Sequence, residues 1–340
     1  MTSHERAGSA RQPQSIGEPG RTVRATAPGG IGNLGPGLDI LGCAVTGLAD
    51  RVTAWRDGSA GVRIVAPGHP ELPSDPSRHA SAIAAQALLE RAALEGQRPF
   101  GVALILEKGL PLAGGQGGSA ASAVAGAAAA NALLDDPLDR MAVLDAALVA
   151  ESIVAGHHLD NVAPCVLGGI VLVRSIDPVD LVTVAVPQAL RIVLALPEMQ
   201  VRTRDARSVL PEQVARATAL YQAAQVAAIV AACSTGDLEL LGRAIDDRIA
   251  EPARAPMLPG FAEAKRAAMT AGALGCSISG AGPTSFALAS SDAGAAVVAA
   301  AMVTAYDAAG LRCTARVARV SGSGVVVEPV ARPAHHGSRE

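Results

Sequence analysis

Aromatic residues are scarce in this sequence, in which Phe, Trp and Tyr together make up 2% of the 340 residues. Half of the chain is nevertheless hydrophobic, so its core must consist mainly of alanine, valine, leucine and isoleucine. The length is sufficient for two domains and a sizeable core.

An excess of charge of one sign is also missing, since the formal net charge is −3. This balance gives no electrostatic reason to expect a nucleic acid or an anionic membrane surface as a partner. The five cysteines are scattered and contain no C-x-x-C pair. They therefore predict no zinc site, and they fit a reduced, cytoplasmic compartment.

Long hydrophobic runs are absent as well. The longest of them, residues 120–134, is too short and too rich in alanine to span a bilayer. The N-terminal segment is polar and lacks the apolar stretch of a signal peptide. We expect a soluble protein with no membrane partner, in which residues 1–20 and 331–340 are disordered tails.

Strand-like and helical patterns mix along the rest of the chain without strict alternation. In the first half, the strand-like runs are residues 23–27, 62–66 and 102–107, and the helical ones are 79–96, 119–134 and 138–152. After Pro178 the pattern begins again, with helices expected at 211–233 and 237–250 among further strands. This mixture predicts an α+β fold in two halves, residues 21–177 and 178–330.

The stretch PLAGGQGGSAAS, residues 111–122, is rich in glycine and leads into an alanine-rich helical segment. Glycine permits positive φ and lets main-chain N–H groups approach a ligand closely. A helix N-terminus adds unpaired N–H donors and partial positive charge, so the segment favours phosphate binding over a flexible turn. A Walker A loop is excluded because no lysine follows the glycines. A dinucleotide-binding loop is disfavoured because Asp135, its candidate acidic residue, follows a helical pattern rather than a strand.

Four further segments are too specialised to be explained by packing alone. They are GGIGNLGPGLDILG (residues 29–42), HHLDNVAPCVLGG (157–169), VRTRDARSVLP (201–211) and CSISGAGPTSFAL (276–288). Taken singly, each also fits a turn, a pair of surface histidines or a solvated helix face. No third His and no Cys stands at metal-ligand spacing from His157 and His158.

Taken together and in this order, with AEPARAPMLPGF at residues 250–261, the motifs resemble those of the homoserine kinases, which belong to the GHMP group of small-molecule kinases. The glycine loop and the S-G-A-G-P turn are shared across the GHMP group. The D-N-V-A-P, T-x-x-A-R and A-E-P-x-R segments are particular to homoserine kinases. The resemblance covers residues 23–327. It implies a two-domain GHMP kinase fold, in which a ribosomal-S5-like N-terminal half binds ATP and the C-terminal half is ferredoxin-like.

The resemblance also implies the reaction, an ATP-dependent phosphorylation of the side-chain hydroxyl of L-homoserine to O-phospho-L-homoserine in threonine biosynthesis. ATP and Mg²⁺ are the implied cofactors, with Ser119 and Glu151 as ligands of the metal. The implied nucleotide contacts are Leu112, Ala113, Gly114, Gly115, Gln116, Gly117, Gly118, Ser119, Ala120, Ala121 and Ser122. The implied substrate contacts are Asn33, Asp39, His158, Asn161, Thr203, Arg207 and Arg254. Of these, the two arginines hold the carboxylate and Asp39 the ammonium group. The implied catalytic residues are Asn161, His158 and Lys108.

The implied mechanism depends on a side chain that the sequence lacks. Asn161 stands where some relatives carry an aspartate base, and an amide cannot take up a proton at neutral pH. We therefore expect direct attack of the hydroxyl on the γ-phosphate without a dedicated carboxylate base, and we expect Asp160 to shape its loop.

The phosphate loop departs from the family pattern, because glycines replace two serines and Gln116 replaces a leucine. The lost hydroxyls predict weaker ATP binding rather than lost activity. Arg202 and Arg204 are expected to face solvent. Two alternatives stay open, a GHMP kinase for another small alcohol such as mevalonate and a catalytically silent small-molecule sensor. A homodimer is left open as well.

Overall fold

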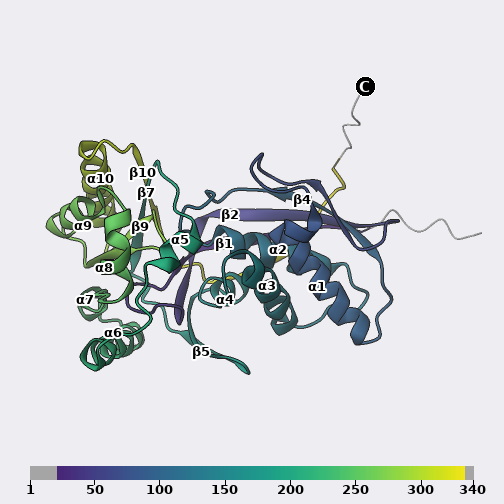
Figure 1. Ribbon diagram of the computed structural model, residues 1–340, viewed down its shortest axis with the longest axis horizontal. Coiled ribbons are helices and arrows are strands. Elements are labelled where there is room, and N and C mark those ends of the chain that lie inside the picture. Colours follow the sequence, from purple (N-terminus) through teal and green to yellow (C-terminus); the bar gives the residue numbers. More distant parts are fainter. Residues whose placement is uncertain (1–20, 334–340) are drawn as a thin grey trace, which may run out of the picture.

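The computed structural model describes residues 21–333, which form two β-sheets with helices packed against them (Figure 1). This mixture of separate sheets and helical layers confirms the predicted α+β class. The tail predicted at residues 1–20 lies outside the described residues, as does the part of the tail predicted at 331–340 that follows residue 333. Residues 331–333 have no regular structure.

The first sheet has seven strands in the order β11-β1-β2-β4-β3, and β5 and β6 extend it from β2. Its strands are β1 (Thr22–Gly32), β2 (Leu41–Asp57), β3 (Val62–Ala66), β4 (Gly101–Glu107), β5 (Ile170–Ile176), β6 (Val179–Val184) and β11 (Val326–Pro329). The boundary predicted at residues 177 and 178 falls in the turn between β5 and β6, which pair with each other. The first sheet therefore extends into residues assigned to the second half.

Four helices lie on one face of this sheet (Figure 1). They are α1 (Ala80–Leu94), α2 (Gly118–Ala132), α3 (Arg140–Val154) and α4 (Val162–Leu167), with a short 3-10 helix, η1 (Pro76–Arg78), before α1. α2 lies directly on β1 and β2, and α1 and α3 pack against α2. The helix that follows the glycine loop is thus at the centre of the larger core.

Small residues account for the close approach of these helices. Residues 120–130 of α2 are all buried, and most of them are alanine. At Gly126, an added Cβ would lie 2.1 Å from the carbonyl oxygen of Ser81 in α1. The scarcity of aromatic residues therefore matches a layer in which helix backbones nearly touch.

The second sheet has four strands in the order β10-β7-β9-β8 and lies between two pairs of helices. Its strands are β7 (Arg191–Pro197), β8 (Gly275–Ile278), β9 (Ser285–Ala289) and β10 (Cys313–Ala318). The remaining helices are α5 (Thr203–Ser208), α6 (Arg216–Thr235), α7 (Leu238–Arg243), α8 (Ala250–Arg254), η2 (Ala255–Met257), α9 (Phe261–Thr270) and α10 (Asp292–Ala308). Ile192 and Leu194 face the core shared with α6 and α7, whereas Val193 and Ala195 face α9 and α10. Because successive side chains of a strand point to opposite faces of the sheet, β7 contributes to two separate cores.

Three elements differ from the sequence expectations. The long strand β2 was not predicted, because glycines and Asp50 interrupt its apolar pattern. The long helix begins at Arg216 rather than at residue 211, and its first helical bond is donated by Ala219 N–H to Ala215 O. The helix expected at 237–250 is divided into α7 and α8, because the carboxylate of Asp247 accepts the N–H groups that begin a new helix.

By length and composition, α6 is the one helix among the described residues that could cross a membrane. One such helix does not distinguish a membrane protein from a soluble one. In this structure Ile229, Ala232 and Cys233 of α6 are buried in the core beside α7.

The close contact at Gly126 gives a test of the helical layer. Replacement of glycine by alanine inside a helix ordinarily stabilises it by about 1 kcal/mol. We expect Gly126→Ala instead to lower the free energy of unfolding by about 1–3 kcal/mol, because its Cβ meets main-chain atoms that cannot move freely. Urea denaturation measures this difference. Gly58→Ala, where an added Cβ would have nothing within 4 Å, is the control and should be nearly neutral. A Gly126→Ala variant as stable as the unmodified chain would contradict the packing described here.

Candidate active site

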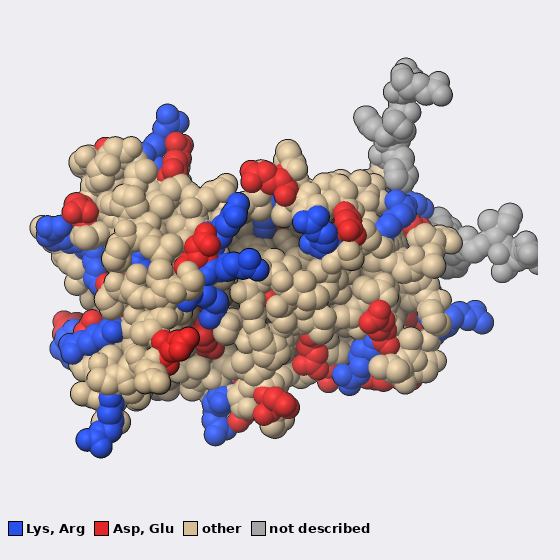
Figure 2. Space-filling view, viewed as in Figure 1, with Lys and Arg blue, Asp and Glu red and all other residues tan. Residues whose placement is uncertain are grey.

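A cavity of about 670 Å³ opens between the two halves of the chain. Its walls come from the glycine loop, α3, the segment before α4, α5, α8 and the turn between β8 and β9. Figure 2 shows a hollow on this face of the molecule, with Lys and Arg side chains at its rim. Distant segments thus meet at one place, and all five motifs singled out in the sequence contribute residues to its lining.

Three main-chain carbonyl groups of the glycine loop are hydrogen-bonded to other parts of the protein. The carbonyl oxygen of Gly114 accepts the hydroxyl of Thr284 at 2.5 Å, and that of Gly115 accepts the hydroxyl of Ser279 at 2.7 Å. The carbonyl oxygen of Gln116 accepts the N–H of Gly30 at 3.0 Å. These three carbonyl groups are therefore bonded to the S-G-A-G-P-T turn and to β1.

The N–H groups of the same loop are left free. Within residues 21–333, no main-chain N–H from residues 114–119 donates a hydrogen bond to another protein group. Gly117 caps α2 with a φ of 68°, and Gly115 has a φ of 73°. An added Cβ at Gly115 would lie 2.6 Å from the carbonyl oxygens of Gly282 and Ser279. Free N–H donors at the head of a helix form a site suited to phosphate.

Ser119 and Glu151 meet the chemical requirements of a site for Mg²⁺. The hydroxyl of Ser119 and the Oε2 atom of Glu151 are both buried and make no hydrogen bond of normal geometry, but they lie close enough for the hydroxyl to offset part of the rise in the pKa of Glu151. Burial raises the pKa of Glu151 to about 7. Among the described residues, no three His, Cys, Asp or Glu side chains gather as metal ligands. A site with one carboxylate and one hydroxyl suits Mg²⁺, which takes its remaining ligands from phosphate and water.

The ammonium group of Lys108 is engaged in contacts within the protein. Its ammonium group forms an ion pair with the fully buried Asp50 and donates to the carbonyl oxygen of Gly118 at 2.8 Å and to the hydroxyl of Ser122 at 3.2 Å. Asp50 also accepts the N–H groups of Gly109 and Leu110, at 3.1 and 3.0 Å. The Asp50–Lys108 pair therefore joins the start of the glycine loop to the first turn of α2.

Opposite the glycine loop, two of the predicted substrate residues are paired with each other. Arg207 binds Asp39 through two hydrogen bonds of 2.7 and 3.2 Å, and Nδ1 of His158 lies 3.4 Å from the same carboxylate. Both partners of the ion pair are partly exposed. The Nε atom of Arg207 is buried and has no partner. Burial also lowers the pKa of His158 below its usual range.

Asp160 and Arg254 are buried at the back of the cavity. Asp160 accepts the N–H of Asn33 at 3.1 Å and the side-chain amide of Asn161 at 3.3 Å. Burial raises the pKa of Asp160 to about 6. Arg254 donates to the carbonyl oxygens of Ala206 at 3.1 Å and Gly280 at 2.8 Å, and burial lowers its pKa.

Most residues predicted for the site reach the cavity. Those that line it are Asn33, Lys108, Leu112, Ala113, Gly114, Gly115, Gly117, Gly118, Ser119, Ser122, Glu151, His158, Asn161, Thr203, Arg207 and Arg254. Ala120 and Ala121 are buried inside α2, and Gln116 turns to Thr284 and Arg316. Asp39 lies behind Arg207.

Several lining residues were not assigned from the sequence. Arg202 and Arg204, expected to face solvent, are exposed at the cavity wall. The opposite end is formed by residues for which the sequence offers no motif, namely Leu72, Pro73, Arg78, His79, Ala80 and Leu106. The only signal for Asp50 is a charged residue within an otherwise apolar stretch.

Comparison with known proteins gives the same assignment for both halves. The model of the GHMP kinases N terminal domain matches residues 79–169, and the GHMP kinases C terminal model matches residues 228–308. The homoserine kinase of Chlorobium phaeobacteroides (strain BS1) is 41% identical over 296 residues, which span 84% of this chain and 92% of that protein. The homoserine kinase of Arabidopsis thaliana is 39% identical over 92% of this chain and 86% of its own length.

A solved structure agrees with these sequences. The crystal structure of homoserine kinase from Cytophaga hutchinsonii superposes with a TM-score of 0.86 and 38% identity, covering 94% of this chain and all of that one. The resemblance drawn from the motifs is thus confirmed, and so is the expectation of an enzyme of the kinase class. The chain belongs to the homoserine kinase family of the GHMP kinases.

Proposed function

We propose that this chain uses ATP to phosphorylate the side-chain hydroxyl of L-homoserine, which yields O-phospho-L-homoserine for threonine biosynthesis. The names of its relatives support the reaction. One structural observation supports the substrate: the cavity has free main-chain N–H donors on one wall, and Arg207 on another wall is paired with Asp39 behind it. The first wall suits a triphosphate, and the second suits a zwitterion.

The Asp39–Arg207 pair explains selection for an amino acid. The ammonium group of homoserine replaces Arg207 on Asp39, and its carboxylate replaces Asp39 on Arg207, with the guanidinium of Arg254 near by. Each charge that loses a partner gains a new one, so the exchange leaves no charge unpaired. Mevalonate would leave Asp39 without a cation, and a neutral sugar carries no charge that could replace either residue in the pair. Asn33, His158 and Thr203 complete the acceptor pocket.

ATP binds with its phosphates on the N–H groups of the glycine loop. Ser119 and Glu151 would hold Mg²⁺, which would supply positive charge to the phosphate oxygens. The nucleoside end of ATP lies toward Leu72, Pro73 and Leu106, which give this part of the cavity its apolar wall. The Asp50–Lys108 pair keeps the loop in place beside α2.

The transfer itself needs positioning more than proton abstraction. The transition state of phosphoryl transfer is loose, so the attacking hydroxyl need not be deprotonated in advance. The amide of Asn161 and the ring of His158 orient that hydroxyl. Asp160 is engaged with Asn33 and Asn161 and holds both of them. We therefore assign Asp160 to positioning and place no carboxylate base in the mechanism.

The choice of acceptor is tested by measuring ADP release with L-homoserine, mevalonate and galactose. We expect turnover with L-homoserine and none above background with the other two, because only a zwitterion supplies a partner to both Asp39 and Arg207. Turnover of mevalonate or galactose at a comparable kcat/KM would instead indicate a different GHMP kinase. A chain that turns over none of the three would match a silent sensor.

The absence of a carboxylate base is tested with Asp160→Asn. We expect kcat to fall by less than about 100-fold, because the remaining side-chain oxygen still accepts the N–H of Asn33. We also expect the variant to keep the same fall in kcat toward low pH as the unmodified chain. A loss of about 10⁴-fold or more, with an unchanged melting temperature, would identify Asp160 as a base. If the fall in kcat near pH 6 disappeared in the variant, that result would also identify Asp160 as a base.

The raised pKa of Glu151 predicts a pH dependence of metal use. A carboxylate with a pKa of about 7 is protonated increasingly as the pH falls below 7, and only its charged form binds Mg²⁺ well. We expect KM for Mg-ATP at low Mg²⁺ to rise as the pH falls from 8 to 6, and a higher Mg²⁺ concentration to shift this rise to lower pH. Glu151→Gln is the control, because it retains only the titration of ATP itself. Identical pH profiles for the two proteins would contradict the assignment of Glu151.

A further inference from the structure

Arg254 reaches the acceptor pocket from a helix that cannot fix its own orientation. α8 is five residues long, and Arg254 is its last residue. Helices of this length are not stable by themselves, because too few hydrogen bonds offset the cost of ordering the backbone. The guanidinium of Arg254 is held by its hydrogen bonds to Ala206 and Gly280, so it is the position of its backbone that must be fixed by contacts elsewhere on α8 and on the segment before it.

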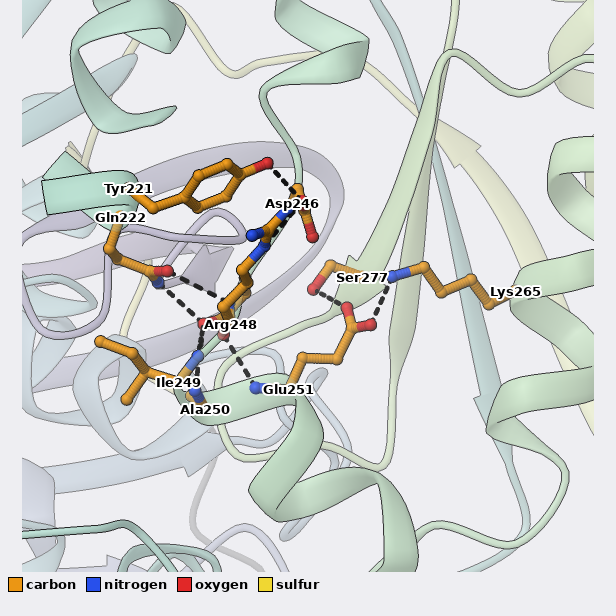
Figure 3. A network of polar contacts seen from close by, with 10 residues as sticks. Tyr221, Gln222, Asp246, Arg248, Ile249, Ala250, Glu251, Lys265 and Ser277 are labelled. Carbon is orange, nitrogen blue, oxygen red and sulfur yellow. Dashed lines mark hydrogen bonds and ion pairs between the residues drawn. The ribbon is translucent and has the colours of Figure 1, made fainter. Parts of the chain in front are cut away.

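Asp247 provides the first of these contacts, to the three residues that begin α8 and are labelled in Figure 3 as Ile249, Ala250 and Glu251. Its Oδ1 atom accepts the N–H groups of Ile249 at 2.8 Å and Ala250 at 3.0 Å, and its Oδ2 atom accepts the N–H of Glu251 at 2.9 Å. One buried carboxylate thus satisfies the N–H groups that begin α8. Asp247 defines where the helix starts.

Gln222 connects this carboxylate to the other wall of the acceptor pocket. Its Nε2 atom donates to Asp247 Oδ1 at 2.8 Å and to the carbonyl oxygen of Pro36 at 2.9 Å, and its Oε1 atom accepts the N–H of Arg248 at 3.1 Å. Both donors and the acceptor of the amide are therefore used. Pro36 belongs to the loop between β1 and β2 that carries Asp39.

The burial of Gln222 is unusual for its position. α6 exposes most of its length, yet the side chain of Gln222 is 7% exposed. Beside it, the hydroxyl of Tyr221 donates to Asp246 at 2.6 Å, and the Arg248 guanidinium lies over the Tyr221 ring. These neighbours hold the segment before α8 against α6 (Figure 3). The hydrogen bond from Gln222 to Pro36 extends this set of contacts to the 33–39 loop.

The far side of α8 is held independently. The carboxylate of Glu251 pairs with the ammonium group of Lys265 and accepts the hydroxyl of Ser277 at 2.6 Å. This contact joins α8 to α9 and β8. Loss of the Gln222 amide would therefore leave α8 attached to the second sheet and remove its connection to Pro36. The link through the carbonyl oxygen of Gly280, which accepts from both Asn33 and Arg254, would remain.

We propose that Gln222, acting through Asp247, is a positioning residue that sets the spacing between the loop of Asp39 and the helix of Arg254. That spacing determines how well the pocket matches the ammonium and carboxylate groups of an amino acid, so the role rests on the proposed function. Gln222 does not line the cavity and is not expected to touch either substrate. Its removal should weaken binding of the acceptor and leave binding of ATP unchanged.

The test compares Gln222→Met with Gln225→Met. Both replace an amide by a thioether of similar length on α6. The side-chain amide of Gln222 makes the hydrogen bonds described above, whereas that of Gln225 makes none to a described residue. We expect Gln222→Met to raise KM for L-homoserine by about tenfold or more, since a buried acceptor and a helix cap lose their partner. KM for ATP should stay unchanged. Gln225→Met should match the unmodified chain in both constants.

Hydrogen exchange on the free protein gives a second readout that does not depend on the substrate. We expect faster exchange of the amides at 33–39 and 249–251 in Gln222→Met and not in Gln225→Met. If Gln222→Met does not fold, Asp247→Asn serves as the milder variant, because it removes one acceptor for Glu251 N–H while keeping the other oxygen.

The outcomes separate this role from the proposed function. Equal exchange in the two methionine variants, or equal KM for the acceptor while the unmodified chain is active, would overturn the positioning role. An unmodified chain that does not turn over L-homoserine would contradict the proposed function instead. The exchange comparison would then still decide whether Gln222 holds the two segments together.

Discussion

The orientation of one loop is the constraint on which the site depends. Gly114, Gly115 and Gln116 direct their carbonyl oxygens to partners behind the loop, so that the N–H groups of the loop remain available to the cavity. Two of these partners are the hydroxyls of Ser279 and Thr284, which belong to the second sheet's hairpin. The phosphate-binding surface is therefore produced by both halves of the chain.

Polar and charged groups in the site and behind it fall into two kinds. Asp50, Lys108 and Asp247 have their hydrogen-bonding capacity used by the protein and maintain its geometry. Ser119, Glu151 and Arg207 each retain a buried polar atom without a partner. Buried polar groups are ordinarily satisfied, so the second kind marks the positions where ligands are expected. The Asp39–Arg207 pair is intermediate, because the protein satisfies it until an amino acid of both charges replaces each partner.

The parts of this site that could be predicted from the sequence are those with a local chemical signature. The glycine loop, the T-x-x-A-R arginine and the A-E-P-x-R arginine all belong to short motifs, and the structure brings them to one cavity. Asp50 and Gln222 carry no such signature. Asp50 lies in a strand whose apolar pattern it interrupts, and Gln222 resembles any polar residue on a helix surface. Their roles depend on partners 58 and 186 residues away along the chain, which no local pattern specifies.

The most direct measurement is a crystal structure of the chain with a non-hydrolysable ATP analogue, Mg²⁺ and L-homoserine. We expect phosphate oxygens within hydrogen-bonding distance of the N–H groups of residues 114–119, with the metal between Ser119 and Glu151. The ammonium group of homoserine should lie on Asp39, and its carboxylate on Arg207. Phosphates bound elsewhere, or an Asp39–Arg207 pair that stays intact beside bound homoserine, would contradict the central claim.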